Sequence, residues 1–293
     1  MKNLMFKSAR ALAVVAGLAV AGPALAAGEG PHVEKQPWSF AGPFGQFDKA
    51  QLQRGFQVYK EVCSSCHGLS YVAFRNLAEE GGPGFSVDEV KALAAEYTIE
   101  DGPDNEGEMF ERDGKPFDKF PSPFPNEQAA RAANNSAYPP DLSLIAKARA
   151  VTRGFPWFVL DVATQYQENG PDYLYALLTG YEEEFPACAG EQDGYFNPKF
   201  IGGSLPESCK DAHLTGGAIQ MAPPLSDELV EYSDGSPMTV DQYARDVSAF
   251  LMWTAEPHLE SRKRIGFGVM AFLILFASLL YFTKRKIWRD VDH

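Results

Sequence analysis

The sequence has few residues that could react as thiols or ligate a metal. Its 293 residues include only four cysteines and five histidines. Cys63 and Cys66 form the one C-x-x-C pair, and Cys188 and Cys209 stand alone. A zinc site built on this pair would need a second pair of ligands, and a redox-active C-x-x-C pair needs no histidine after it. Nothing in the sequence indicates a Ser/His/Asp set or paired catalytic carboxylates.

Basic residues are also scarce. The chain has 26 Lys and Arg against 39 Asp and Glu. Residues 27–261 contain sixteen of the basic residues and thirty-seven of the acidic ones, so this region has a net charge of −21. Such an acidic region excludes nucleic acid as a partner. One interpretation is that these acidic residues only keep the protein surface solvated. The other is that they attract a basic protein. Residues 96–111 and 182–184 are where an attracting field would be concentrated.

Long apolar stretches occur only near the two ends. Residues 11–22 form a short one, preceded by three basic residues and followed by an Ala-Leu-Ala cleavage signal. This pattern predicts a secretory signal peptide over residues 1–26, with the mature chain starting at Ala27. A mitochondrial transit peptide would be richer in Arg and Ser, so we expect bacterial export.

The second apolar stretch, residues 265–282, contains no charge and is bracketed by basic clusters. As a helix it would span about 27 Å, close to the thickness of a bilayer core. A buried core helix would not need basic residues at both ends, which are typical of headgroup contacts. We therefore expect a single-pass protein of the bacterial inner membrane: residues 27–261 in the periplasm, 262–284 as the transmembrane anchor, and 285–293 in the cytoplasm.

The most specific motif is Cys63-Ser64-Ser65-Cys66-His67. This is the C-x-x-C-H spacing that attaches a c-type haem covalently and ligates its iron. The two thiols reach the two vinyl groups of the porphyrin, and His67 supplies an axial imidazole. One motif predicts one covalently bound haem c.

The iron needs a sixth ligand unless the site binds gases or peroxide. Met221 stands in a helix-poor stretch, residues 216–224, that two prolines stiffen just after the sulfur. Met252, by contrast, fits the buried face of a helix. A His/Met pair leaves no open coordination position and favours electron transfer. On the residues alone the candidates remain Met109, Met221, Met238 and Met252, with His32, His213 and His258 as alternatives.

The rest of the pattern is mainly helical with long loops. Asp48 and Gln51 predict the start of a helix that delivers the chain to Cys63. Another helix begins near Thr239 and ends before Pro257, so a short charged hinge should precede the anchor. Helices are also expected at about 141–149 and 171–178, and loops at 81–84 and 116–125.

Several motifs, in order along the chain, together resemble the cytochrome c1 family of the cytochrome bc1 complex, in its alphaproteobacterial form. The resemblance implies a mainly α fold: a class I c-type cytochrome-like haem domain with long loop insertions, plus one C-terminal transmembrane helix. The motifs are Phe56-Gln57-Val58-Tyr59, Ala129 through Asn135, Pro139-Pro140-Asp141-Leu142-Ser143, Asp172-Tyr173, Leu177 through Tyr181, Tyr195-Phe196-Asn197-Pro198, Met221-Ala222-Pro223-Pro224-Leu225 and Arg262-Lys263-Arg264.

The resemblance also implies roles for individual residues. The axial methionine of the family falls on Met221, and the arginine that pairs with a haem propionate falls on Arg149. The tyrosine beside the haem falls on Tyr173, and Asn134 and Pro140 are expected to line the haem pocket. Each assignment has an ordinary structural alternative, such as a helix C-terminus for the arginine or a core position for the tyrosine.

The chain departs from the shorter mitochondrial pattern by extra residues around 202–213. These include Cys209, and only Cys188 is left to pair with it outside the haem motif. In an oxidising compartment we expect a Cys188–Cys209 disulfide, as in bacterial members of the family. It should hold the Met221 loop against the haem and so affect the haem potential.

In function, the resemblance implies an electron-transfer subunit of ubiquinol:cytochrome c oxidoreductase. The chain would accept electrons from a Rieske iron–sulfur protein and pass them to a soluble or membrane-tethered cytochrome c, in a dimeric complex that contains cytochrome b. A membrane-anchored cytochrome c that donates to a terminal oxidase or serves a periplasmic dehydrogenase would share the signal, haem and anchor. A haem enzyme or gas sensor would need an open sixth position. Respiratory and photosynthetic roles both stay open.

Overall fold

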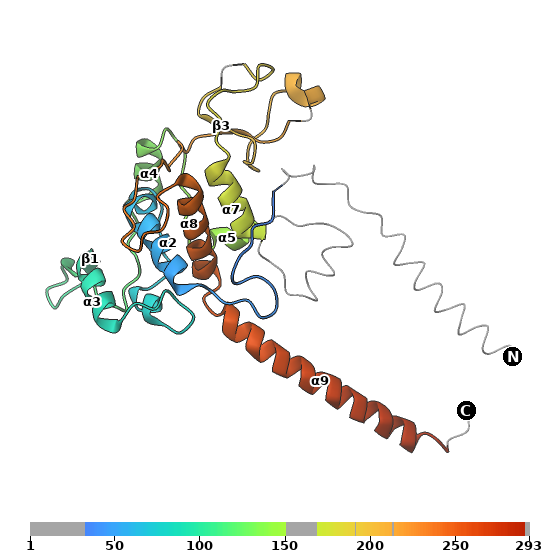
Figure 1. Cartoon of the computed structure of the whole chain (residues 1–293). Coiled ribbons are helices and arrows are strands. Elements are labelled where there is room, and N and C mark those ends of the chain that lie inside the picture. Colours follow the sequence, from blue (N-terminus) through green and yellow to red (C-terminus); the bar gives the residue numbers. More distant parts are fainter. Residues whose placement is uncertain (1–32, 151–168, 191, 213, 291–293) are drawn as a thin grey trace.

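A computed structural model describes residues 33–150, 169–190, 192–212 and 214–290. The expected signal peptide and the candidate ligands His32 and His213 lie outside these ranges. The described part is mainly helical, as predicted, with a head of short helices and long loops from which one long helix projects (Figure 1). The centre of the head is the pair α2 (Lys49–Glu61) and α8 (Val240–Ala255), and α7 (Asn169–Thr179) packs on the other side of α8.

Helix α2 forms where the sequence predicted it. The Asp48 carboxylate accepts hydrogen bonds from the backbone N of Ala50 and Gln51, at 2.9 and 3.3 Å, and so caps the helix. Phe56 and Tyr59, on its buried face, lie against Phe250 of α8 with ring centroids 5.7 and 6.0 Å apart. The helix ends at Glu61, and only Val62 separates it from Cys63, so core packing fixes where the haem motif begins.

A close approach of the backbones holds α2 against α8. At Gly55, a Cβ atom would lie 2.1 Å from the Asp246 carbonyl oxygen and 2.7 Å from the Phe250 Cβ. Only glycine leaves room for this crossing, although glycine costs about 1 kcal/mol in a helix interior.

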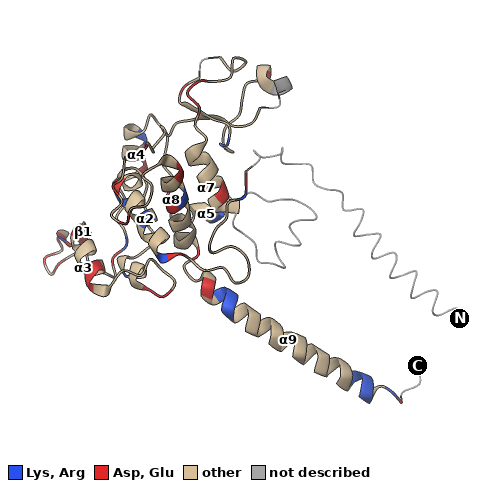
Figure 2. Cartoon of the chain, viewed as in Figure 1, with Lys and Arg blue, Asp and Glu red and all other residues tan. Residues whose placement is uncertain are grey.

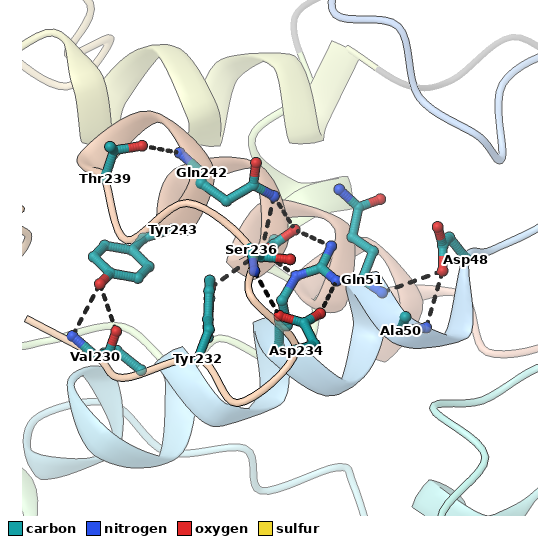
Figure 3. A network of polar contacts seen from close by, with 12 residues as sticks. Asp48, Ala50, Gln51, Val230, Tyr232, Asp234, Ser236, Thr239, Gln242 and Tyr243 are labelled. Atoms are coloured by element: carbon teal, nitrogen blue, oxygen red, sulfur yellow. Dashed lines mark hydrogen bonds and ion pairs between the residues drawn. The ribbon is translucent and has the colours of Figure 1, made fainter. Parts of the chain in front are cut away.

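Beside this crossing lies a buried polar network (Figure 3). Asp246 of α8 is fully buried and accepts hydrogen bonds from Arg54 Nε at 2.8 Å, Tyr232 Oη at 3.1 Å and Gln242 Nε2 at 2.9 Å. Arg54 reaches on to Asp234 at 2.8 Å. Burial alone would lower the pKa of Arg54, but the hydrogen bonds and negative charges of Asp246 and Asp234 raise it above its ordinary value. The network ties α2 and α8 to the segment that follows Met221.

The helix expected at 141–149 is shorter than predicted. Only α5 (Ile145–Ala148) is helical, because Asp141, Leu142 and Ser143 bond to residues 68–71 instead of continuing a helix. Pro139 and Pro140 restrict the backbone just before them.

The other described elements are short and lie mostly in the loops. The acidic residues 96–111 form most of a β-hairpin that the sequence analysis did not predict. Its strands are β1 (Thr98–Asp101) and β2 (Phe110–Asp113), with Thr98 opposite Asp113. The remainder are η1 (Cys63–Ser65), η2 (Phe74–Ala78), α3 (Val87–Ala95), α4 (Glu127–Ala133), β3 (Tyr195–Asn197), η3 (Glu207–Ala212) and β4 (Gly217–Ile219), which pairs antiparallel with β3.

The long projecting helix is α9 (Leu259–Ile287), which is long and apolar enough to cross a membrane. Figure 2 shows basic residues at both ends and none along its middle. The basic residues expected in a hinge belong to the first turns of α9, so residues 256–258 alone link it to α8. In this link, Glu256 pairs with Lys147 at 3.4 Å and with Arg262.

Candidate functional site

The C-x-x-C-H motif leaves α2 through a single tight turn. The backbone N of Cys66 and of His67 both donate to the Cys63 carbonyl, at 3.1 and 2.9 Å. Ser64 Oγ donates to the Lys60 carbonyl at 2.7 Å and ties the turn to the helix end. Cys63 and Cys66 are half-buried free thiols, and burial raises the pKa of Cys63 to about 12. The turn therefore presents two unpaired cysteines and an imidazole within five residues.

The His67 ring is held in the form that can ligate a metal. Its Nδ1 lies 2.8 Å from the Pro140 carbonyl oxygen. A carbonyl only accepts, so Nδ1 carries the proton and Nε2 is left with its lone pair. Burial lowers the pKa of His67, against an opposing hydrogen bond to Pro140. Tyr59 Oη also donates to the His67 carbonyl at 3.0 Å and fixes the backbone from the core side.

The segment that holds His67 is itself locked to the chain after the motif. The backbone N of Leu142 donates to the Gly68 carbonyl at 2.9 Å. Asp141 accepts from the Ser70 backbone N at 2.8 Å, and the Ser143 hydroxyl accepts from Tyr71 N at 3.1 Å. Burial alone would raise the pKa of Asp141, but hydrogen bonds from Ser143 and Ser70 lower it overall. Pro140 is thereby a fixed acceptor for the imidazole.

Three other predicted residues are Arg149, Tyr173 and Met221, and Tyr181 contributes to their surroundings. Tyr181 Oη donates to the Met221 carbonyl at 3.1 Å, and Tyr173 Oη accepts from Ile201 N at 3.3 Å. Burial and then the proximity of Tyr173 raise the pKa of Tyr181. Burial also raises the pKa of Tyr173, whereas the Ile201 N–H and the positive charge of Arg149 oppose that rise. Tyr181 therefore joins the Met221 backbone to the surroundings of Tyr173, and the charge of Arg149 acts on Tyr173.

Burial separates the candidate methionine ligands. Met252 is 1% exposed within the core, whereas Met109 and Met238 are 55% and 38% exposed on loops. Met221 is half-buried, in the loop after β4. The histidine candidate His258 is exposed at the N-terminus of α9.

Within the part of the chain that the structure describes, the hydrogen bonds of Asn134 do not join it to this group. They lie within its own turn at the end of α4: its Nδ2 donates to the Ala130 carbonyl at 2.7 Å, and its backbone bonds to Arg131 and Ala137. A role in the haem pocket for this residue stays a prediction.

The expected disulfide is present. Cys188 and Cys209 are bonded, with Cα atoms 5.2 Å apart, and Ser208 Oγ donates to the Cys188 carbonyl at 2.6 Å. Past this bridge, β4 leads into Gln220, whose Nε2 donates to the Asp193 carbonyl at 3.1 Å. The chain that delivers Met221 is therefore fastened on both sides of β4.

Sequence reasoning missed the roles of Tyr59 and Tyr181, which position the backbones of His67 and Met221. Tyr59 could have been found, since it lies on the buried face of α2 one turn before Cys63. No local sequence pattern indicates the role of Tyr181, because it lies 40 positions from Met221.

Comparison with known proteins decides the family. A model described as the cytochrome C1 family matches residues 38–291. The chain belongs to the cytochrome c1 family. It is 57% identical to "Cytochrome b/c1" of Bradyrhizobium diazoefficiens over 98% of this chain, which spans 41% of that protein. It is also 50% identical to cytochrome c1 of Blastochloris viridis and 46% identical to that of Cereibacter sphaeroides, each over 96% of this chain and 95% of the relative.

The cytochrome c1 family carries a covalently attached c-type haem, and the residues described here fit that group. Two free thiols and an imidazole with an unprotonated Nε2 match the donors that covalent haem requires.

Proposed function

We propose that this cytochrome c1 carries one haem c and relays electrons within ubiquinol:cytochrome c oxidoreductase. The observation that carries the proposal is the geometry of His67. Its Nδ1–H is used by Pro140 and its Nε2 remains available, directly after two unpaired cysteines. This arrangement suits an axial haem ligand and has no evident use in a purely structural turn.

The proposed haem contacts are divided among elements that the fold already holds rigid. Cys63 and Cys66 would hold the haem through thioether bonds, and His67 Nε2 and Met221 Sδ would ligate its iron. Arg149 would pair with a propionate, Tyr173 would lie beside the ring, and Asn134 and Pro140 would line the pocket. A haem ligated by His and Met supplies a one-electron couple with a raised potential and no open coordination site.

The chain's own residues would act only by holding and orienting. Tyr59 and Pro140 keep the imidazole in place, and Tyr181 keeps the Met221 backbone in place. No proton donor or nucleophile is needed, because only an electron moves. In this proposal a Rieske iron–sulfur protein delivers it and a soluble or membrane-tethered cytochrome c removes it.

The proposed setting is a dimeric complex with cytochrome b in the bacterial inner membrane. The head would lie in the periplasm, α9 would cross the bilayer, and the C-terminus would be cytoplasmic. The family, the basic ends of α9 and its apolar middle support this arrangement.

Replacing the proposed sulfur ligand tests the assignment. Met221→Leu should abolish the long-wavelength charge-transfer band of the oxidised protein, lower its midpoint potential, and allow carbon monoxide to bind the reduced form. Leucine fills a similar volume but cannot donate to iron. The measurements are optical spectra and a redox titration of the purified full-length holoprotein.

Met238→Leu is the matched control, since that side chain is a loop methionine and 38% exposed. Its spectrum and potential should be those of the unaltered protein. If Met221→Leu keeps the band and the potential, another residue is the ligand and the proposed site is wrong.

A further inference from the structure

A charge-free segment near the start of the described chain carries an unusually exposed aromatic side chain. Residues 36–47 contain no Asp, Glu, Lys or Arg. Trp38, Phe40 and Phe47 are buried, whereas Phe44 is 80% exposed, more than any other large hydrophobic side chain among the described residues. A single exposed apolar side chain is ordinary on a protein surface, so the meaning of this one depends on what surrounds it.

The exposure of Phe44 is built into a closed loop. The backbone N of Ala41 donates to the Trp38 carbonyl and that of Gln46 to the Ser39 carbonyl, both at 3.1 Å. Gly42, with φ +70°, makes the turn that a β-carbon would strain. The base of the loop is fixed by Trp38, whose Nε1 donates to Asp172 at 2.7 Å. The aromatic rings of the loop also contact one another: Trp38 stacks on Phe40 with ring centroids 5.4 Å apart, and Phe40 meets Phe47 at 4.8 Å with the ring planes tilted by 39°.

The loop is clamped to the first turns of α9. Lys263 is 4% exposed and donates from Nζ to the Phe40 carbonyl at 2.7 Å. Glu260 accepts from the Phe47 backbone N at 2.8 Å. In Figure 1 the loop lies beside the beginning of α9, at the end of the head from which the helix leaves. The tip of the loop is therefore held at a fixed height along the helix.

The tip of the loop lies beside the apolar part of α9. The Phe44 ring stacks on Phe267 with centroids 5.0 Å apart and planes at 15°. Phe267 belongs to the charge-free residues 265–282 and follows Arg264 by three positions. A residue at the level of Phe267 lies past the basic residues that would contact lipid headgroups.

From this geometry we infer that residues 41–45 are a second membrane contact, in which Phe44 inserts among the lipid chains just below the headgroups, on the side of the head. The inference rests on the proposed membrane anchor. A lipid surface is the occupant because the loop is uncharged, its tip is apolar, and it continues the lipid-facing surface of α9. Aromatic side chains favour this boundary.

Site-specific photo-crosslinking tests the contact in the full-length holoprotein. Para-benzoyl-phenylalanine replaces Phe44 in one variant, Phe267 in a second and Phe117 in a third. Phe117 is 56% exposed and lies in the turn after β2, far along the chain from α9. After irradiation of native membranes, mass spectrometry of the purified chain should show the added mass of one phospholipid at positions 44 and 267 and not at 117.

The outcomes separate the inference from the anchor proposal. Lipid adducts at position 267 but none at 44 would overturn the inference alone, and adducts at 44 only to another polypeptide would replace it by a protein contact. Absence of lipid adducts at both positions would overturn the anchor and the inference together. Because Phe44 has no part in the proposed haem site, the haem spectrum reports that each variant is folded.

A thiol variant gives a second measurement. All four native cysteines are assigned to the haem or to the disulfide, so Phe44→Cys introduces a unique thiol in the holoprotein. In native membranes it should react with a water-soluble maleimide more slowly than the thiol of Phe117→Cys. Equal rates would place the loop in water and overturn the inference.

Discussion

At the scale of single residues, the buried carboxylate of Asp246 is the most consequential group outside the haem site. Three side chains donate to it, and one of them, Arg54, comes from the helix that delivers the haem motif. A buried ion pair contributes little net stability compared with an apolar pair, but removal of one partner leaves the other uncompensated.

Asp246→Asn should therefore lower the free energy of unfolding by about 3 kcal/mol. The remaining amide cannot balance the Arg54 charge, and Asp234 is an exposed and weaker partner. Denaturant unfolding of the full-length holoprotein, followed by circular dichroism, measures the change.

Asp88→Asn is the control, because the Asp88 side chain is 91% exposed and its ion-pair partner among the described residues is the exposed Lys91. It should change the stability by less than about 1 kcal/mol. If the two variants lose the same amount, Asp234 and solvent compensate Arg54 and the network is not a stability determinant.

At the scale of elements, the crossing of α2 and α8 decides where the haem motif starts. Gly55→Ala should lower the stability by about 1–3 kcal/mol, because the new Cβ overlaps the Asp246 carbonyl and forces the helices apart. Thermal unfolding measures this, and the haem spectrum of the folded variant shows whether the motif moves with α2.

Gly268→Ala makes the same chemical change in α9, where an added Cβ meets no atom within 4 Å. Its unfolding temperature should equal or exceed that of the unaltered protein, because alanine is the better helix former and meets no obstacle there. Equal behaviour of the two alanine variants would contradict the tight crossing.

The disulfide gives a second prediction at this scale. Replacing Cys188 and Cys209 by Ala removes a bridge across 21 positions and should destabilise the chain by about 3 kcal/mol in the loop-entropy account. It should also lower the haem midpoint potential, since the loop carrying Met221 is less restrained and the sulfur ligand is held more weakly. A redox titration and the optical spectrum measure both effects.

Ser208→Ala, which removes a neighbouring hydrogen bond and keeps the disulfide, should leave the potential where it is. An unchanged potential and spectrum in the double Cys variant would show that the bridge and the proposed ligand are not coupled.

Local sequence signals predicted some elements and not others. α2 and α8 combine a capping residue with apolar positions at helical spacing, so their starts were predictable at Asp48 and Thr239. The hairpin β1–β2 has no alternating apolar pattern. Ion pairs of Arg112 with Asp101, 11 positions away, and with Asp118, 6 positions away, help to hold it instead. The helix expected at 141–149 was predicted too long, because Asp141 and Ser143 bond to a segment about 70 positions away and stay outside α5.

At the scale of the whole molecule, acidic charge should steer a basic cytochrome c. Residues 182–184 are exposed and directly follow Tyr181, which holds the Met221 backbone. The second-order rate of electron transfer should fall as salt rises, since the Debye length shrinks from about 30 Å at about 0.01 M to about 8 Å at about 0.15 M. Stopped-flow kinetics measures the dependence.

Replacement of Glu182, Glu183 and Glu184 by Gln should flatten that dependence more than the same change at Glu100, Glu106 and Glu108 in the hairpin segment. Rates that do not vary with ionic strength in the unaltered protein would exclude steering.

The proposed site was only partly predictable from the sequence, because some of its contacts join residues that are far apart in the chain. C-x-x-C-H is local in sequence, so Cys63, Cys66 and His67 could be assigned without a fold. On the residues alone Met221 was one of four methionine candidates, and only the resemblance to the cytochrome c1 family favours it. Its partial burial and the bond of its backbone to Tyr181 are compatible with that assignment. The partner of His67, Pro140, lies 73 positions away and becomes visible only when the chain is folded.

The short link between α8 and α9 has a mechanical consequence. Glu256 bridges Lys147 of α5 and Arg262 of α9, and Glu260 and Lys263 hold the loop of residues 36–47 against the first turns of α9. Head and helix should therefore tilt together as one rigid unit. A thinner bilayer increases the tilt of a helix that is too long for it. Membrane thickness would then set how far the redox centre stands above the lipid, and with it the distance an incoming electron must cross.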